Sequence, residues 1–114
     1  MEPLAVGWHT AKLAVRALDV TMEKRALVIG GGAIGLATAL ALKAMGIDDL
    51  TISEFNPLRR ENLLHHIDAN VVEKSEGLFP IVIDAVGFAS TRSAASQLVS
   101  PGGIIAHVGL GNNA

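Results

Sequence analysis

The stretch that decides the fold is residues 28–35, with the sequence VIGGGAIG, which matches the pattern G-x-G-x-x-G. An apolar run over residues 26–29 leads into the glycines and an Ala/Leu-rich run follows, so the pattern lies where a buried strand turns into a helix. Gly30 allows the tight turn, Gly32 lets a pyrophosphate approach the backbone, and Gly35 lets the helix pack closely on the sheet. Because free amides at a helix N-terminus attract phosphate, the stretch predicts a dinucleotide-binding turn.

Glu54 is the acid expected to accompany these glycines, because it closes the next predicted strand, residues 50–53, and follows Gly35 by 19 residues. A carboxylate there accepts hydrogen bonds from the adenosine ribose hydroxyls and repels a 2′-phosphate, so it favours NAD over NADP. Arg59 and Arg60 follow closely, and arginine usually receives a 2′-phosphate, which keeps NADP as the second choice. We expect Glu54→Ser to improve NADP binding.

Strands and helices alternate along the chain. Apolar periodicity and capping residues predict helices over residues 2–17, 33–45, 57–65 and 90–99, and strands over residues 26–29, 50–53, 70–72, 81–83 and 104–108. This alternation predicts an α/β fold, a doubly wound parallel sheet with the Rossmann strand order 3-2-1-4-5. Only residues 73–80 separate the third and fourth strands, and they contain Gly77 and Pro80, so an extended link without a helix is expected.

Ligands of such sheets lie at the carboxyl ends of the strands. Residues 85–87 follow the fourth predicted strand and residues 108–110 close the fifth, so their backbones are expected beside the adenosine and the nicotinamide, respectively. Asp84 is expected to be a buried structural acid that needs hydrogen bonds from nearby amides. Thr91 is expected to cap a helix, and His107 to pack rather than to relay protons.

The composition narrows the function further. The chain has 114 residues, a net charge of −2 and neither cysteine nor tyrosine. This length fits one domain, and no basic face indicates nucleic acid or a membrane as a partner. The lack of cysteine excludes disulfides and thiolate zinc ligands within this chain, and it fits a cytoplasmic protein. The 17 uncharged residues 26–42 contain four glycines, so a strand entering a buried helix explains them better than a membrane span does.

Four segments carry a family resemblance: residues 2–6 (EPLAV), 30–35 (GGGAIG), 83–87 (IDAVG) and 98–103 (LVSPGG). Together they resemble the coenzyme domain of the zinc-dependent medium-chain alcohol dehydrogenases, over nearly the whole chain. The opening EPLAV is similar to the polyol (sorbitol, idonate) and threonine dehydrogenase branch, in which the glutamate here lies beside the catalytic zinc. The resemblance implies that Glu2 belongs to a zinc site, that Arg59 lies near the adenosine ribose, and that the full protein oxidises alcohols or polyols with NAD.

The motifs and the resemblance together give one set of expected cofactor-binding residues: Gly30, Gly32, Ala33, Ile34, Gly35, Glu54, Arg59, Ala85, Val86, Gly87, Val108 and Gly109. The family usually has proline where Ala33 stands, a helix between the third and fourth strands, and a sixth strand that would follow Ala114. We therefore expect residues 1–114 to form an NAD(P)-binding domain truncated before its sixth strand. Zinc would be held mainly by a catalytic domain absent from this chain, so no catalytic residue is assigned. The full-length enzyme is expected to be a cytoplasmic dimer or tetramer, and this chain alone to be inactive.

Other functions share some of these features. A zinc-free quinone-reductase-like member of the same superfamily would keep the glycine turn, although EPLAV argues against it. A non-catalytic nucleotide-binding or S-adenosylmethionine-binding module would also use a glycine turn and an acid after the second strand. A short-chain reductase is disfavoured because it would need a catalytic tyrosine.

Overall fold

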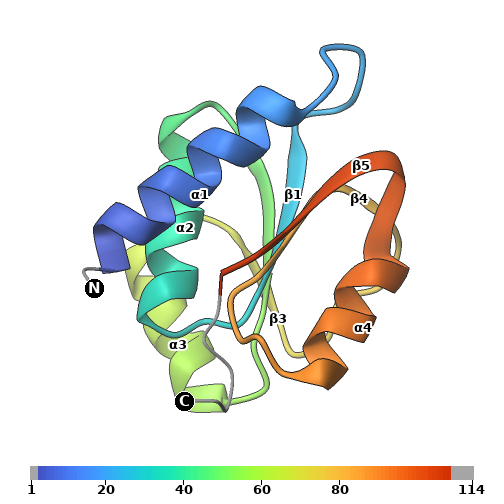
Figure 1. Cartoon of the computed structure of the whole chain (residues 1–114). Helices are drawn as coiled ribbons and strands as arrows, with labels where there is room; N and C mark the ends of the chain where they lie inside the picture. Colours follow the sequence, from blue (N-terminus) through green and yellow to red (C-terminus); the bar gives the residue numbers. More distant parts are fainter. Residues whose placement is uncertain (1–2, 109–114) are drawn as a thin grey trace.

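The computed structural model describes residues 3–108 (Figure 1). In chain order the elements are α1 (Pro3–Ala17), β1 (Arg25–Ile29), α2 (Ala33–Ala44), β2 (Asp49–Ser53), α3 (Pro57–His66), β3 (Asn70–Val72), β4 (Phe79–Asp84), α4 (Ala89–Leu98) and β5 (Val99–His107). Every predicted boundary except the start of β5 lies within two residues of the observed one. Within the described residues, no helix is both long and apolar enough to cross a membrane.

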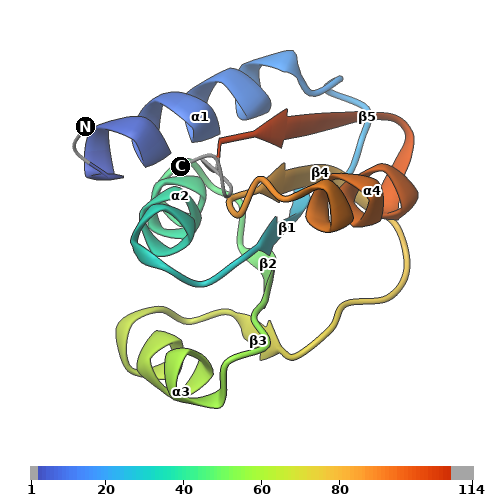
Figure 2. The same cartoon turned by 60° about the horizontal axis from the view of Figure 1, so that its bottom comes forward.

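The strands form one five-stranded parallel sheet in the order β3-β2-β1-β4-β5, which confirms the predicted Rossmann order. β1 lies at the centre, paired with β2 on one side and β4 on the other. Figure 2 shows α1, α2 and α3 on one side of the sheet and α4 on the other. Because all strands run the same way, their carboxyl ends meet at one edge, and the strand order reverses there between β1 and β4.

The core has two layers, one on each face of the sheet. On the side of α1 and α2, Val28 and Ile83 are fully buried. On the side of α4, Leu27 and Val82 pack with Ala95. Burial of each large side chain contributes about 1.5–3 kcal/mol. Successive apolar residues of β1 and β4 point to opposite faces of the sheet, so the same two strands stabilise both layers.

Helices α1 and α2 cross in close contact at Gly7. A Cβ atom on Gly7 would lie 2.6 Å from the backbone nitrogen of Thr38 and 2.9 Å from the Cβ of Ala37. Glycine is therefore the residue that allows this approach, which buries Ala11 and Ala14 of α1.

The link between β3 and β4, residues 73–78, contains no helix, as predicted. It runs on the same side of the sheet as α4 and passes over β2 and β1 to reach β4 (Figure 2). No crossover helix therefore covers β2 and β3 on this face, and the link itself forms one wall of the site described below.

β5 begins five residues earlier than predicted, at Val99 instead of Ile104. Proline and two glycines in residues 100–103 predicted a turn, but the backbone stays in the strand. The turn-forming residues are absorbed as an irregularity in the pairing, which moves from Phe79 opposite Val99 to Ile81 opposite Ile104.

Candidate dinucleotide-binding site

The glycine turn has the open geometry that a phosphate site requires. Gly30 has a φ of 101°, which L side chains rarely adopt, and its N–H donates to the Ser53 carbonyl at 2.8 Å. A Cβ atom on Gly35 would collide with the Gly30 carbonyl oxygen, so Gly35 sets the close packing of α2 on the turn. Gly32 caps α2 without a side chain, and a Cβ atom there would meet nothing within 4 Å. The N-terminus of α2 is thus bare beside open space, at the end of the helix where the backbone dipole is positive.

Glu54 faces this turn and is bound to it. Its Oε1 accepts a hydrogen bond from the Gly31 N–H at 2.6 Å, and its Oε2 accepts one from the Asn56 N–H at 2.9 Å. The side chain is only 9% exposed. Each carboxylate oxygen has two lone pairs, so both can still accept a hydrogen bond from a ligand hydroxyl group.

The two arginines of α3 lie differently. The Nη1 of Arg59 is 3.9 Å from the Oε1 of Glu54, and the Arg59 side chain is 61% exposed. Arg60 instead donates from Nη1 to the backbone carbonyls of Glu54 at 2.8 Å and Phe55 at 2.9 Å. Arg60 therefore fixes the turn after β2, whereas Arg59 presents a cation beside the Glu54 carboxylate.

The turn after β4 is organised by Asp84, which is fully buried. Its Oδ1 accepts hydrogen bonds from the N–H groups of Val86 and Gly87, both at 2.9 Å. Its Oδ2 lies 3.3 Å from the Thr91 hydroxyl and 3.1 Å from Nδ1 of His107. Burial alone would raise the pKa of Asp84, but these four hydrogen bonds outweigh it and hold the pKa below its ordinary value. The expectation of a buried acid that binds nearby amides is confirmed.

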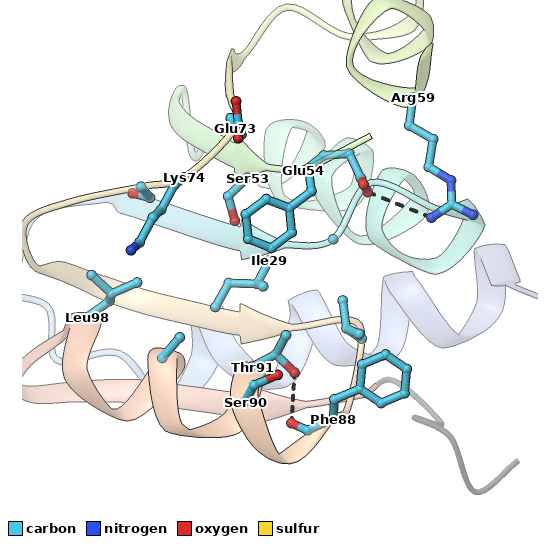
Figure 3. A pocket seen from close by; sticks show the side chains of 15 residues that line it. Ile29, Ser53, Glu54, Arg59, Glu73, Lys74, Phe88, Ser90, Thr91 and Leu98 are labelled. Carbon is cyan, nitrogen blue, oxygen red and sulfur yellow. Dashed lines mark hydrogen bonds and ion pairs between the residues drawn. The ribbon is translucent and has the colours of Figure 1, made fainter. Parts of the chain in front are cut away.

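A cavity of about 360 Å³ opens at the carboxyl ends of β1, β2 and β4 (Figure 3). One wall comes from β2 and the turn after it, a second from the β3–β4 link, and a third from α4, from Ser90 to Leu98. Its lining residues are Ile29, Gly30, Ser53, Glu54, Phe55, Arg59, Glu73, Lys74, Ser75, Val86, Phe88, Ser90, Thr91, Ala94 and Leu98. Glu54 and Arg59 lie at one end of this cavity, and Lys74 and Leu98 lie at the other (Figure 3).

The structure brings together most of the residues expected to bind a cofactor. Four of them line the cavity: Gly30, Glu54, Arg59 and Val86. Four more belong to the start of α2 or cap it: Gly32, Ala33, Ile34 and Gly35. Ala85 and Gly87 follow β4, and the Val108 N–H donates to the Asp84 carbonyl at 2.9 Å. Glu2 and Gly109 lie outside the described residues.

Sequence reasoning missed the apolar and link residues of the cavity. Phe55 and Phe88 lie in the turns that follow β2 and β4 and are exposed, and an aromatic residue in the turn after each strand was the available signal. Lys74 and Ser75 gave no local signal, because the position of the link depends on the strand order. Thr91 does not cap α4 as expected: Phe88 is the cap residue, without a side-chain hydrogen bond, and the Thr91 hydroxyl donates to the Phe88 carbonyl at 2.9 Å.

Residues 3–108 contain no cluster of three or more histidine, cysteine, aspartate or glutamate side chains that could hold a metal ion. This part of the chain does not fit a zinc site, and we derive no zinc chemistry from it.

Comparison with known proteins yields relatives along almost the full chain. No protein-family model matches it. Sorbitol dehydrogenase from Bos taurus is 29% identical and aligns with 98% of this chain and 35% of its own length. L-Idonate 5-dehydrogenase from Vitis vinifera is 31% identical, with 96% of this chain and 33% of the relative covered. A crystal structure from Sinorhizobium meliloti, named as a zinc-binding dehydrogenase bound to NADP, is 21% identical, covers 96% of this chain and 35% of its own, and has a TM-score of 0.80.

The chain spans about a third of the length of these curated relatives. These alignments cover 98% and 96% of the chain, so they span the segments that form the site described above. The relatives that cover nearly the whole of this chain are thus zinc-dependent medium-chain dehydrogenases of the sorbitol and L-idonate type, and the chain shares the fold of a zinc-binding dehydrogenase.

Proposed function

We propose that residues 1–114 form the NAD-binding domain of an alcohol or polyol dehydrogenase, an oxidoreductase that acts on CH–OH groups. The observation that carries this proposal is the pairing of a bare helix N-terminus at Gly32 with a carboxylate, Glu54, hydrogen-bonded into the same turn. A phosphate site alone would fit many nucleotides, whereas the adjacent carboxylate favours a ribose with free hydroxyls.

The described residues fit a dinucleotide. The amides of residues 32–35 would bind the pyrophosphate at the open end of α2. Glu54 would accept hydrogen bonds from the adenosine ribose, and the cavity between the turn after β2 and α4 would hold the adenine ring between Phe55 and Phe88 or the neighbouring apolar side chains. The nicotinamide, when bound, supplies the hydride acceptor, and this domain supplies its position.

NAD is proposed over NADP because Glu54 would repel a 2′-phosphate. The exposed Arg59 beside Glu54 is the feature that favours NADP, but its guanidinium already lies beside an anion, the Glu54 carboxylate, at 3.9 Å. The Glu54 carboxylate is buried and held by two backbone N–H groups, so it cannot swing away to admit a phosphate without breaking both hydrogen bonds.

The properties of a whole enzyme are proposed from the relatives and the sequence. The relatives are named sorbitol dehydrogenase and L-idonate 5-dehydrogenase, which supports a small alcohol or polyol as the substrate. A zinc ion would be held by residues outside 3–108, with Glu2 as the one contribution proposed from this chain. A cytoplasmic homo-oligomer is proposed, because a chain with no cysteine fits a reducing compartment and β5 borders the sheet with its outer edge unpaired among the described strands.

Calorimetric titration of the 114-residue chain tests this proposal. We expect ADP-ribose and NAD to bind with similar affinity, because the site described here contacts the adenosine diphosphate half. AMP should bind more weakly than ADP-ribose, since it lacks the second phosphate, and NADP more weakly than NAD. The proposal is wrong if S-adenosylmethionine binds and the dinucleotides do not, and the NAD assignment is wrong if NADP binds more tightly.

A further inference from the structure

Asp84 joins three parts of the chain at the edge of the proposed site. It ends β4, and it is the pairing partner of Ile29 on β1 and of His107 on β5. Partner residues on neighbouring parallel strands point to the same face, so the His107 and Asp84 side chains emerge side by side. The observed contact, 3.1 Å from Nδ1 of His107 to Oδ2 of Asp84, follows from this register.

The Asp84 carboxylate holds the turn that packs against the glycines. Its Oδ1 accepts the N–H groups of Val86 and Gly87, and Gly87 has a φ of 88°. Val86 lies so close to the glycine turn that a Cβ atom on Gly30 would be 2.6 Å from its Cγ2. The position of the Asp84 carboxylate therefore determines where Val86 lies relative to Gly30.

His107 is the donor that completes this arrangement from β5. An ionised carboxylate can only accept hydrogen bonds, so Nδ1 of His107 carries the proton, and Nε2 is left for other partners. The other donor near Oδ2, the Thr91 hydroxyl, is farther away at 3.3 Å, and the Phe88 carbonyl at 2.9 Å competes with Asp84 for its single proton. The Oδ2 atom thus depends mainly on His107, which is 39% exposed and so is not required to fill the core.

We infer that His107 is a positioning residue for the dinucleotide: by fixing the Asp84 carboxylate, it sets the turn formed by residues 85–88 and thereby the affinity for NAD. The ligand in this inference rests on the proposed function, but the state of the turn can be measured without any ligand. The observed polar contact of the His107 side chain is with Asp84, so the inferred effect on the ligand is transmitted through Asp84.

The test compares two substitutions of His107 in the full chain. His107→Leu removes the donor, whereas His107→Asn keeps an N–H donor near the place of Nδ1. Amide hydrogen exchange measured by NMR reports the turn through the Val86 and Gly87 N–H groups. The Ala85 N–H, which donates to the Ile29 carbonyl at 2.9 Å, is the internal reference. His66→Leu is the matched control, because Nδ1 of this exposed histidine lies 2.8 Å from the Asn62 carbonyl of its own helix, away from the Asp84 turn.

For His107→Leu we expect the protection of the Val86 and Gly87 amides to fall about tenfold, with Ala85 unchanged, and the dissociation constant of NAD to rise about tenfold. His107→Asn should restore both quantities to within about twofold of the wild type, and His66→Leu should change neither.

The inference is overturned if His107→Leu leaves amide protection and NAD affinity unchanged, or if His107→Asn is as impaired as His107→Leu. Should His107→Leu not fold, His107→Ala also removes the donor, and the same comparison applies. If the wild-type chain does not bind NAD, the proposed function fails, while the exchange of the Val86 and Gly87 amides still decides whether His107 holds the turn.

Discussion

The Oε1 atom of Glu54 lies 2.6 Å from the backbone nitrogen of Gly31, so the acid after β2 is hydrogen-bonded into the glycine turn before any ligand arrives. A carboxylate proposed to bind a ribose thus also orders the backbone that is proposed to bind the pyrophosphate. Because this hydrogen bond joins the two parts of the proposed site, substitutions at Glu54 should change both the free energy of unfolding and the selectivity for NAD over NADP.

Glu54→Ser should weaken NAD binding about tenfold and raise the affinity for NADP relative to NAD, because the charge that repels a 2′-phosphate is removed and Arg59 is freed from it. The same substitution removes the acceptor of the Gly31 and Asn56 N–H groups, which should cost about 1.5–3 kcal/mol of unfolding free energy. Titrations of both cofactors and urea unfolding measure the two effects. Glu61→Ser, on the exposed side of α3, is the control, and an unchanged NADP-to-NAD ratio in Glu54→Ser would contradict the role of Glu54.

Gly32 and Gly35 should respond in opposite ways to alanine. Gly32 has φ −75° and ψ −165°, which any residue adopts, and its side has open space, so Gly32→Ala should stay within about 0.5 kcal/mol of wild-type stability. The new methyl group would occupy the space proposed for phosphate, and NAD affinity should fall at least tenfold. Gly35→Ala should lose about 2–3 kcal/mol, because its Cβ would overlap the Gly30 carbonyl oxygen. Thermal unfolding and NAD titration of both variants provide the measurements, and normal NAD binding by Gly32→Ala would mean that the phosphate lies elsewhere.

Acid should weaken the fold through Asp84. Its pKa is lowered in the folded chain, because the hydrogen bonds from Gly87, Val86, His107 and Thr91 outweigh the effect of burial. A lowered folded pKa means that the carboxylate stabilises the fold fully above its ordinary pKa of 3.8, and that this contribution is lost as the pH falls below that value.

Urea unfolding between pH 2.5 and about 6 measures this contribution. Asp84→Asn should be less stable at pH 6 and should lose less stability than the wild type on acidification. Asp19→Asn is the necessary comparison, since the pKa of this exposed aspartate is also lowered, by hydrogen bonds from Thr21. Parallel curves for the wild type and Asp84→Asn would exclude Asp84 as a source of acid sensitivity.

Gly7→Ala should destabilise the chain by about 1–3 kcal/mol, although alanine is the better helix former by about 1 kcal/mol. The cause is the backbone of α2, because the added Cβ would lie 2.6 Å from the Thr38 nitrogen. His9→Ala, at an exposed position of the same helix, should leave stability unchanged or raise it slightly. Thermal unfolding compares the two, and equal effects would show that the helix crossing tolerates a methyl group.

The sequence predicted helices and strands well where the hydrophobic periodicity and the helix-capping residues indicate the same boundary. Asn56 followed by Pro57 predicted the start of α3, and the Asn56 side chain does accept hydrogen bonds from the N–H groups of Leu58 and Arg59. The start of β5 was wrong, because residues 100–103 have the composition of a turn and only pairing with β4 keeps them in the strand. A tertiary contact overrides the local preference there.

The sequence predicted the part of the site that is formed by the glycine turn and the acid after β2. The glycines and Glu54 follow from a spacing along the chain, whereas the contact between Asp84 and His107 depends on the register of two strands whose residues are 23 positions apart. The wall formed by Lys74 and Ser75 depends on the route of the link between β3 and β4. Neither the register of two distant strands nor the route of a link can be read from the hydrophobic periodicity of one sequence.

The link of residues 73–78 also limits which changes of chain length this fold can accept. Seven Cα–Cα steps reach about 24 Å at full extension, while the path from the end of β3 to the start of β4 covers about 14 Å across the sheet and about 15 Å back along it, a straight line of about 20 Å. Roughly one residue of slack remains. Deleting residues here would pull β3 off the edge or shift β4 by a register step, whereas additions would only lengthen a surface segment. In evolution and in engineering, this connection should therefore tolerate insertions but almost no deletions.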